Sequence, residues 1–535
     1  MMKRIFSGQF QSITSAALLL GAASFLSRIV GLIRERILSH TFGAGPELDM
    51  YTAAFRVPDC LYNILIVGAL SAGFIPIFLQ LYTENKDKAW KFSNNVLNIT
   101  ALSMGVISLI AFFALPYFLP FFLSGFSEQA QAQTIVLTRI MLISSLFLGL
   151  SAVVSNVLQS LRSFFVYSIA PIFYNFGIIA GALFFVPYFG MNGLAYGVVL
   201  GAFLHLLVQL PLFFSSGFRF SFTFSFKEKN FLHLLRLMVP RTLTLAALQT
   251  NILVMTFFAS TLPSGSIAIY AFATNIASFP IGIVGISFAL AAFPMLSELF
   301  AKGDKENFQK HILTAVKQIL FFIIPITVAF LLLRAQIIRI LLGTGAFDWE
   351  DTIQTAQTLG MLAISFFAQC LIPLLVRAFY AVKDTRTPLF VTLFSMTITI
   401  ACAWLLKDQL GVSGLALAIS MGQIIQLVLL WLPLQKHISG FDIKNFLYGM
   451  LKISGAALCM GLVIQALKYP VSLFVDMETF WGIFVQTTIA GGMGFVIYGA
   501  LCGILRVPEM MITLKTLQKR FFKIKQIPTE TQEIK

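Results

Sequence analysis

The chain has 535 residues, of which 58% are hydrophobic and only 11% charged, and its formal net charge at pH 7 is +15. Soluble globular domains contain about 25% charged residues, so this composition indicates a membrane protein without a large soluble catalytic domain. The five cysteines include no C-x-x-C pair, and the five histidines lack ligand spacing. We therefore expect a carrier, not an enzyme, with no metal site and no bound cofactor.

Apolar segments follow one another along almost the whole chain, separated by short breaks rich in glycine, proline, serine or charge. A membrane-spanning helix needs about 20 apolar residues. We predict an all-α polytopic membrane protein with fourteen transmembrane helices. In chain order the predicted spans are 12–42, 50–82, 93–118, 135–158, 167–186, 192–215, 237–260, 267–300, 311–342, 355–380, 388–406, 414–434, 446–467 and 480–505.

Lysine and arginine alternate between the predicted loops. Every second loop holds basic residues, 15 in total, whereas the loops between them hold only Lys407 and Lys468. Because short cytoplasmic loops carry the basic excess, both termini are predicted to be cytoplasmic. The first apolar run continues past Ser24 with an embedded Arg28, which favours an uncleaved first span over a signal peptide.

The tail, residues 506–535, has seven basic and three acidic residues. We interpret it as an anchor on anionic lipid, and a helix that binds a partner protein is the alternative.

Two pairs of similar segments indicate an internal duplication at an offset of roughly 218 residues. GALSAGFIP at 68–76 resembles GISFALAAFP at 285–294, and LRSFFVYSIAP at 161–171 resembles VRAFYAVKDTRTP at 376–388. Helix-breaking residues at matched positions in two halves are typical of transporters built from repeats. The predicted domains are two six-helix lobes, two further helices and the tail, at 1–216, 217–440, 441–505 and 506–535.

Charged residues inside the apolar spans suggest a path for a solute. A charge at bilayer depth costs at least about 2.5 kcal/mol, and such residues usually face a water-filled cavity. The candidate cavity residues are Arg28, Arg34, Glu35, Asp49, Arg56 and Arg241.

All of these residues except Arg28, which lies too deep in its span to reach the interface easily, also have a purely structural interpretation. Arg56 can reach the lipid headgroups. Arg34 and Arg241 can reach the membrane interface as anchors, and Glu35 can form a packing ion pair with Arg28. Asp49 can stabilise a helix N-terminus. A cytoplasmic hairpin at Arg377, Asp384 and Arg386 is interpreted as a turn stabilised by local ion pairs, with gating or headgroup capture as the alternative.

The string SRIVGLIRERILSHTFGAGPELDMYTAAFRVPD, followed by GALSAGFIPIF, resembles the opening of the MurJ (MviN) family of bacterial lipid II flippases. That family belongs to the multidrug/oligosaccharidyl-lipid/polysaccharide exporter superfamily. RSFFVYSIAPIFYN, MVPRTLTLAALQTN, ALAAFPMLSEL, GAFD and RAFYAVKDTRTP continue the resemblance in the same order. It implies a V-shaped pair of lobes around a cationic cavity, alternating access, and a groove beside the last two helices for the lipid tail.

The resemblance further implies that the chain moves an undecaprenyl-diphosphate-linked peptidoglycan precursor from the inner to the outer leaflet of the bacterial inner membrane. Arginine binds diphosphate oxygens through bidentate, charge-assisted hydrogen bonds. Arg28, Arg34 and Asp49 fall on positions important in the family, and Glu35 stands where the family often has Asp. Coupling to sodium or to membrane potential is implied without an identifiable site. We expect the lipid-linked substrate, membrane lipids and cell-wall synthesis proteins as partners, and no nucleic acid.

Four residues depart from the family pattern. Tyr62 and Asn63 stand where the family has two arginines, Val67 where it has a glutamate, and Asn275 where it has an arginine. Arg241 offers replacement charge. These departures leave three alternatives: a flippase for another polyprenyl-diphosphate-linked glycan, a related drug exporter, or a transport-inactive scaffold for cell-wall synthesis.

Overall fold

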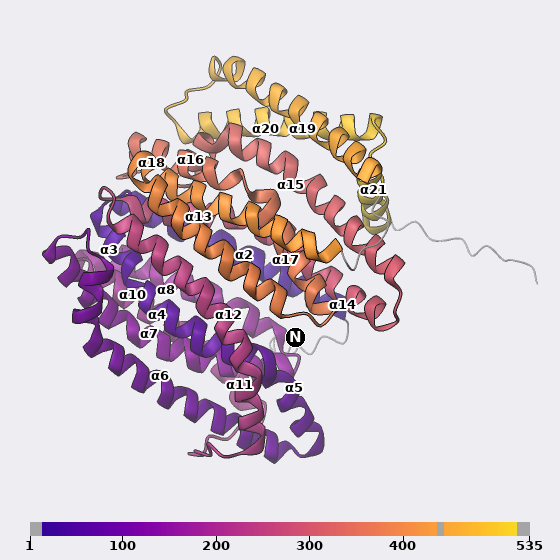
Figure 1. Cartoon of the computed structure of the whole chain (residues 1–535). Helices are drawn as coiled ribbons and strands as arrows, with labels where there is room; N and C mark the ends of the chain where they lie inside the picture. Colours follow the sequence, from indigo (N-terminus) through magenta and orange to yellow (C-terminus); the bar gives the residue numbers. More distant parts are fainter. Residues whose placement is uncertain (1–12, 436–442, 522–535) are drawn as a thin grey trace, which may run out of the picture. The chain divides into compact units, whose positions relative to one another are not determined.

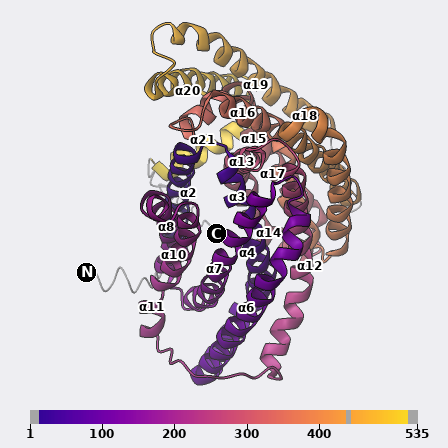
Figure 2. The same cartoon turned by 90° about the vertical axis from the view of Figure 1, so that its left-hand side faces the viewer.

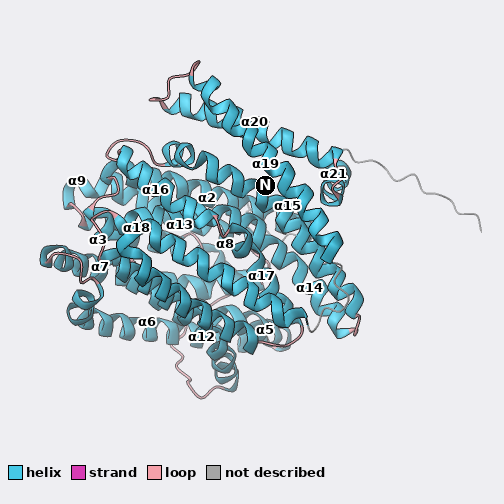
Figure 3. Cartoon of the chain, turned by 45° about the horizontal axis from the view of Figure 1, so that its top comes forward, coloured by secondary structure: helices cyan, strands magenta, loops and turns pink. Residues whose placement is uncertain are grey.

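The computed structural model describes residues 13–435 and 443–521, except the side chains of 13–20, 67–72, 240, 241, 244, 443 and 515–521. Throughout this part the regular structure is helical, without a strand (Figures 1 and 3). Two compact units can be distinguished, and each is considered separately below. The first comprises Met1–Thr274, Leu341–Thr358 and Met396–Ile419, and the second comprises Asn275–Ile340, Leu359–Ser395 and Ser420–Lys535.

The expected class, a polytopic helical membrane protein, is confirmed. Within the described residues nine helices are long and apolar enough to cross a membrane, or ten if the bent pair α16–α17 is one span. Each of the fourteen predicted segments coincides with one helix or with a broken run of helices. Two of them merge in α18 (Arg386–Leu434), but Gly411 has a positive φ of 58° and interrupts the helical backbone there, because glycine tolerates this conformation.

Most helices of the first unit belong to the N-terminal half of the chain. They are α2 (Ile13–Phe42), α3 (Pro46–Ala54), α4 (Arg56–Leu61), η1 (Tyr62–Val67), α5 (Gly68–Glu84), α6 (Lys86–Phe122), α7 (Glu128–Ser160), α8 (Phe164–Ala180), η2 (Gly181–Phe185), α9 (Val186–Phe189), α10 (Asn192–Leu207), α11 (Leu210–Ser215), α12 (Lys229–Ser260) and the beginning of α13 (Ser266–Pro280).

Small residues allow close helix packing in the first unit. Helix α10 packs on α7 and α8, and α8 packs on α2 (Figure 2). A Cβ on Gly177 would lie 2.2 Å from the Cα of Gly201, and one on Gly197 would lie 2.5 Å from the Cα of Gly181. Glycines four residues apart on both helices therefore bring the backbones together, as in many membrane helix pairs.

The second unit continues from α13 to the end of the described chain. Its helices are η3 (Ile281–Ile286), α14 (Ser287–Ala301), α15 (Lys305–Leu341), α16 (Trp349–Ala363), α17 (Phe366–Ala381), α18, α19 (Ile443–Ser472), α20 (Phe480–Ile504) and α21 (Pro508–Phe521), although parts of α16 and α18 belong to the first unit. Helices α19 and α20 run side by side (Figure 1). The Tyr498 hydroxyl of α20 donates a 2.7 Å hydrogen bond to the Phe321 carbonyl of α15, which ties the pair to the unit.

The two similar segments found in the sequence share a local structure. The π-helical η1 directly precedes the first of them, and the π-helical η3 extends over the first two residues of the second. The hairpins of the second pair also share a turn, since Arg162 and Lys383 both adopt a positive φ, of 60° and 63°. The backbone thus has matching irregularities in the two proposed repeats. Division of the chain at residues 216, 440 and 505 stays a prediction.

We predict that Gly197→Val destabilises the protein by at least about 1–3 kcal/mol, because the new side chain forces α10 away from α8. Thermal unfolding in detergent, followed by size-exclusion fluorescence, measures the effect. Gly105→Val is the matched control, because a Cβ at Gly105 meets nothing within 4 Å. Equal melting temperatures of the two variants would contradict the close packing.

Candidate functional site

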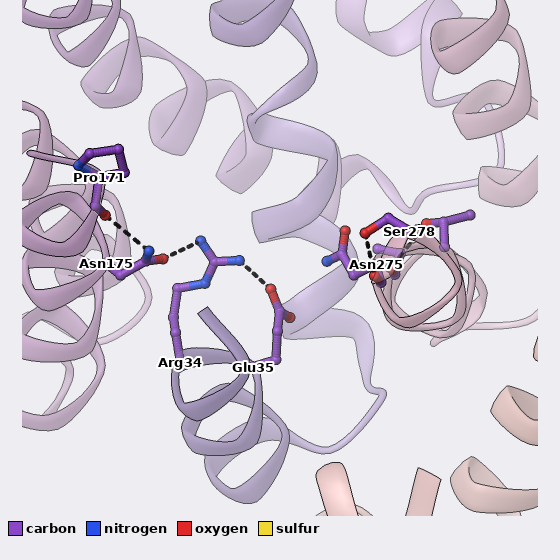
Figure 4. Close-up of polar contacts among 8 residues, drawn as sticks. Arg34, Glu35, Pro171, Asn175, Asn275 and Ser278 are labelled. Carbon is purple, nitrogen blue, oxygen red and sulfur yellow. Dashed lines mark hydrogen bonds and ion pairs between the residues drawn. The ribbon is translucent and has the colours of Figure 1, made fainter. Parts of the chain in front are cut away.

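A polar cluster on α2 and α8 holds the first predicted cavity residues. The Nη1 of Arg34 donates a 3.0 Å hydrogen bond to Oδ1 of Asn175, and its Nη2 bonds the Glu35 carboxylate (Figure 4). Asn175 in turn donates to the Pro171 carbonyl at 3.0 Å, which fixes the orientation of its amide. Arg34 and Glu35 are mostly buried, with side chains 23% and 13% exposed. The structure therefore brings these two predicted residues together.

A cavity of about 260 Å³ lies next along the chain in the first unit. Its polar lining comprises Arg56 and Asp59 of α4, Asn63 of η1 and Gln249 of α12. The Asp59 carbonyl accepts hydrogen bonds from the Asn63 amide at 2.9 Å and the Gln249 amide at 3.4 Å. The Asp59 carboxylate lies within electrostatic range of both Arg56 and Arg34. The negative charge of Asp59 therefore acts on both arginines.

A break in the second predicted span positions this cavity. Helix α3 ends at Ala54, and α4 begins at Arg56. Pro58 lies four residues after Ala54, has no N–H to donate to its carbonyl and would clash with it in a regular helix. The π-helical η1 follows at once. Such irregular segments are frequent at functional sites, and here they direct Arg56, Asp59 and Asn63 to one cavity.

Two guanidinium groups in this region are not fully paired with protein acceptors. The Nε atoms of Arg34 and Arg56 are buried and have no hydrogen-bond partner among the described protein atoms. A buried donor without a partner costs about 1–3 kcal/mol, and a bound anion with several acceptor oxygens would remove that cost. The arrangement therefore fits recognition of an anionic group.

The described contacts do not place the remaining predicted residues in this cluster or in the cavity lining. Arg28 is half-buried on α2, two helical turns before Glu35. Tyr62 begins η1, and Asn275 of the second unit accepts a 2.6 Å backbone hydrogen bond from Ser278 (Figure 4). The side chains of Val67 and Arg241 lie outside the described residues, so their assignments stay predictions.

Asp49 has a clear structural partner. Its buried carboxylate accepts hydrogen bonds from the backbone N–H groups of Gly265 at 2.6 Å and Ala268 at 2.8 Å. These groups belong to the start of α13, where negative charge is stabilising. Asp49 thus caps a helix far away in sequence, not its own helix, and a direct role in transport stays a prediction.

The hairpin before α18 is built around Asp384. Its carboxylate accepts hydrogen bonds from the backbone N–H groups of Arg386 and Thr387, both at 3.0 Å, and from the Thr387 hydroxyl at 2.6 Å. Asp384 therefore caps the N-terminus of α18. Arg377 is half-buried on α17. These contacts favour a stable turn, and gating by the hairpin stays a prediction.

Sequence reasoning missed Asp59, Asn175 and Gln249. Asp59 had a signal, because it follows Arg56 by three residues inside an apolar span and therefore shares its helix face. Asn175 and Gln249 lie within the family-like strings RSFFVYSIAPIFYN and MVPRTLTLAALQTN, but neither stood out there, since lone amides in apolar helices usually have local partners.

Comparisons with known proteins agree with the geometry. The family model described as "Lipid II flippase MurJ" matches residues 38–485. A probable lipid II flippase MurJ of Thermotoga maritima is 32% identical over 83% of this chain and 89% of its own length. The lipid II flippase MurJ of Burkholderia cenocepacia is 26% identical over 83% of this chain and 88% of its own length.

Solved structures match the fold as well. A lipid II flippase MurJ in an inward closed conformation superposes with a TM-score of 0.76 at 27% identity, covering 91% of this chain and 98% of that one. An inward-facing multidrug resistance transporter of the MATE family, 17% identical, has a TM-score of 0.65 over 82% of this chain and 98% of its own. The second match shows the fold alone.

We predict that Asp49→Ala lowers the free energy of unfolding by about 2–4 kcal/mol, because two buried N–H groups lose a charged acceptor. Thermal unfolding of purified protein provides the measurement. Glu47→Ala, which removes an exposed acid from the same helical turn, serves as the control and should leave the melting temperature unchanged. If both variants melt like the wild type, the capping role is refuted.

Proposed function

We infer that this chain, which belongs to the MurJ family of lipid II flippases, carries lipid II from the inner to the outer leaflet of the bacterial inner membrane. The family match extends over most of the chain and is the observation that carries this proposal. The chain acts as a carrier without covalent chemistry, and the substrate headgroup passes through the protein while its lipid tail stays in the membrane.

The cationic site supports this substrate. A diphosphate cannot cross hydrocarbon without replacing its hydration. Arg34 and Arg56 offer guanidinium donors that match phosphate oxygens, and the cavity at Arg56 also offers the amides of Asn63 and Gln249. Asp59 and Glu35 limit the net positive charge, which favours release of the substrate after its transfer. We propose that Arg28 extends the same path along α2.

The topology that we propose has fourteen spans and two cytoplasmic termini. Gly411 divides α18 into two spans, and the bent pair α16–α17 counts as one. Helix α2, the broken run α3–α5 and α12 supply three more. The alternation of basic loops orients this arrangement. We further propose two lobes in a V shape that work by alternating access, with α19 and α20 beside a groove for the lipid tail.

A transport-inactive scaffold is the second candidate. It is supported by Tyr62 and Asn63, which replace two arginines of the family pattern in the very segment that lines the cavity. The scaffold and the carrier differ in one respect that can be tested. Transport by a carrier requires the cations of α2 and α4, whereas the activity of a scaffold does not.

We predict that the wild type rescues a bacterium depleted of its lipid II flippase, whereas Arg34→Ala and Arg28→Ala do not, because each removes a cation from the substrate path. Growth at matched membrane expression is the measurement. Arg139→Ala is the control, since Arg139 bonds the Phe112 carbonyl at 3.2 Å and lies over its ring.

Rescue by all three variants would contradict the role of Arg28 and Arg34 in the substrate path. Failure of correctly inserted wild type would favour a different lipid-linked substrate or the scaffold.

A further inference from the structure

An unusual segment connects α11 to α12. Residues 218–226 read FRFSFTFSF, so aromatic and polar side chains alternate. In Figure 2 the segment crosses the lower end of α6 as a strap without regular secondary structure. Phe218 at its start is buried against Phe213, with ring centroids 4.2 Å apart. The remaining phenylalanines are exposed: Phe220 by 49%, Phe222 by 84%, Phe224 by 50% and Phe226 by 54%.

Three asparagines of α6 hold the other side of this strap. Asn94 donates to the Arg219 carbonyl and accepts from the Ser221 N–H, both at 2.9 Å. Asn98 donates to the Ser221 carbonyl at 2.8 Å and to that of Thr223 at 3.2 Å.

Asn95 completes the set. It donates to the Ser225 carbonyl at 2.9 Å and accepts from the Ser225 N–H at 2.7 Å. The asparagines thus bond the backbone of Arg219, Ser221, Thr223 and Ser225 as a neighbouring strand would. These bonds hold the odd-numbered residues against α6, so that the phenylalanines between them face outward.

This arrangement has a physical consequence for the surroundings of the strap. A row of four exposed phenylalanines in water is an aggregation hazard. Backbone polar groups cannot enter a hydrocarbon core unless they are paired inside the protein. The asparagines pair only the carbonyls of the four odd-numbered residues and the N–H groups of Ser221 and Ser225. The strap therefore suits the boundary between headgroups and acyl chains, where water remains for the other groups.

Basic residues indicate which surface covers the row. Arg219, Lys227 and Lys229 are exposed at the two ends of the strap, and each cation near an anionic leaflet contributes about 1 kcal/mol of attraction. Helix α6, which carries the three asparagines, is a candidate membrane span, and α11, which precedes the strap, belongs to the candidate span Asn192–Ser215. A leaflet of anionic lipid therefore meets both the aromatic and the cationic residues.

We propose that the strap at residues 218–226 is an interfacial anchor, which inserts Phe220, Phe222, Phe224 and Phe226 at the acyl boundary of a leaflet containing anionic phospholipid. Its flanking cations bind the phosphates of that lipid. The anchor holds the connection between the two proposed six-helix lobes at a fixed depth in the membrane.

Fluorescence quenching by brominated lipid tests the proposal. The full chain carrying Phe222→Trp is placed in nanodiscs of phosphatidylcholine and phosphatidylglycerol, with bromine on the upper acyl carbons, and its signal is corrected for that of the wild type. We expect bromine to remove most of the added fluorescence and aqueous acrylamide to remove little. Phe224→Trp provides a second reporter, and Lys305→Trp, at the exposed first residue of α15, provides the water-facing control.

Two further results bear on the proposal. Replacement of phosphatidylglycerol by neutral lipid, or the combined change Arg219→Gln, Lys227→Gln and Lys229→Gln, should weaken quenching by bromine. If the two reporters behave like Lys305→Trp, the strap faces water. If they are protected from acrylamide but not quenched by bromine, a protein surface covers them. Either result overturns the proposal.

Discussion

The cost of burying charge in an apolar environment is the constraint on which the site depends. Arg34 lies in a helix that is otherwise suited to hydrocarbon, and it is tolerated because Asn175 and Glu35 accept two of its donors. The negative charge of Asp59 likewise offsets the cost of burying the Arg56 cation. The compensation is incomplete, since both arginines keep a buried Nε without a partner. A fully paired cluster would stabilise the fold better, so the unpaired donors favour a role in binding an anion.

Helix irregularities make this arrangement possible. A regular helix through the second span would spread Arg56, Asp59 and Asn63 along a continuous hydrogen-bonded backbone. Pro58 and η1 interrupt it, and the segment lines a cavity instead. Close contact between α8 and α10 through Gly177 and Gly201 provides the rigid neighbour that carries Asn175. Tight packing on one side and a broken helix on the other thus serve the same site.

The sequence predicted most of the helical organisation, because apolar segments and their breaks are local properties. The break at Gly411 and the charged segment at Arg34 and Glu35 could be located in this way. The partner of Asp49 could not, since Gly265 and Ala268 are more than 200 residues away and only the folded chain brings them together. Asn175 and Gln249 escaped prediction for the same reason, and π-helical segments have no reliable sequence pattern.

Transport by the purified protein tests the central claim most directly. The protein is reconstituted into proteoliposomes with fluorescent lipid II, and a membrane-impermeant quencher reports exchange between leaflets, with a sodium gradient or a membrane potential imposed in turn. We expect exchange well above that of protein-free vesicles, and its loss in Arg34→Ala protein that remains folded. If folded wild type exchanges lipid II no faster than empty vesicles under every gradient, the chain is not a lipid II flippase.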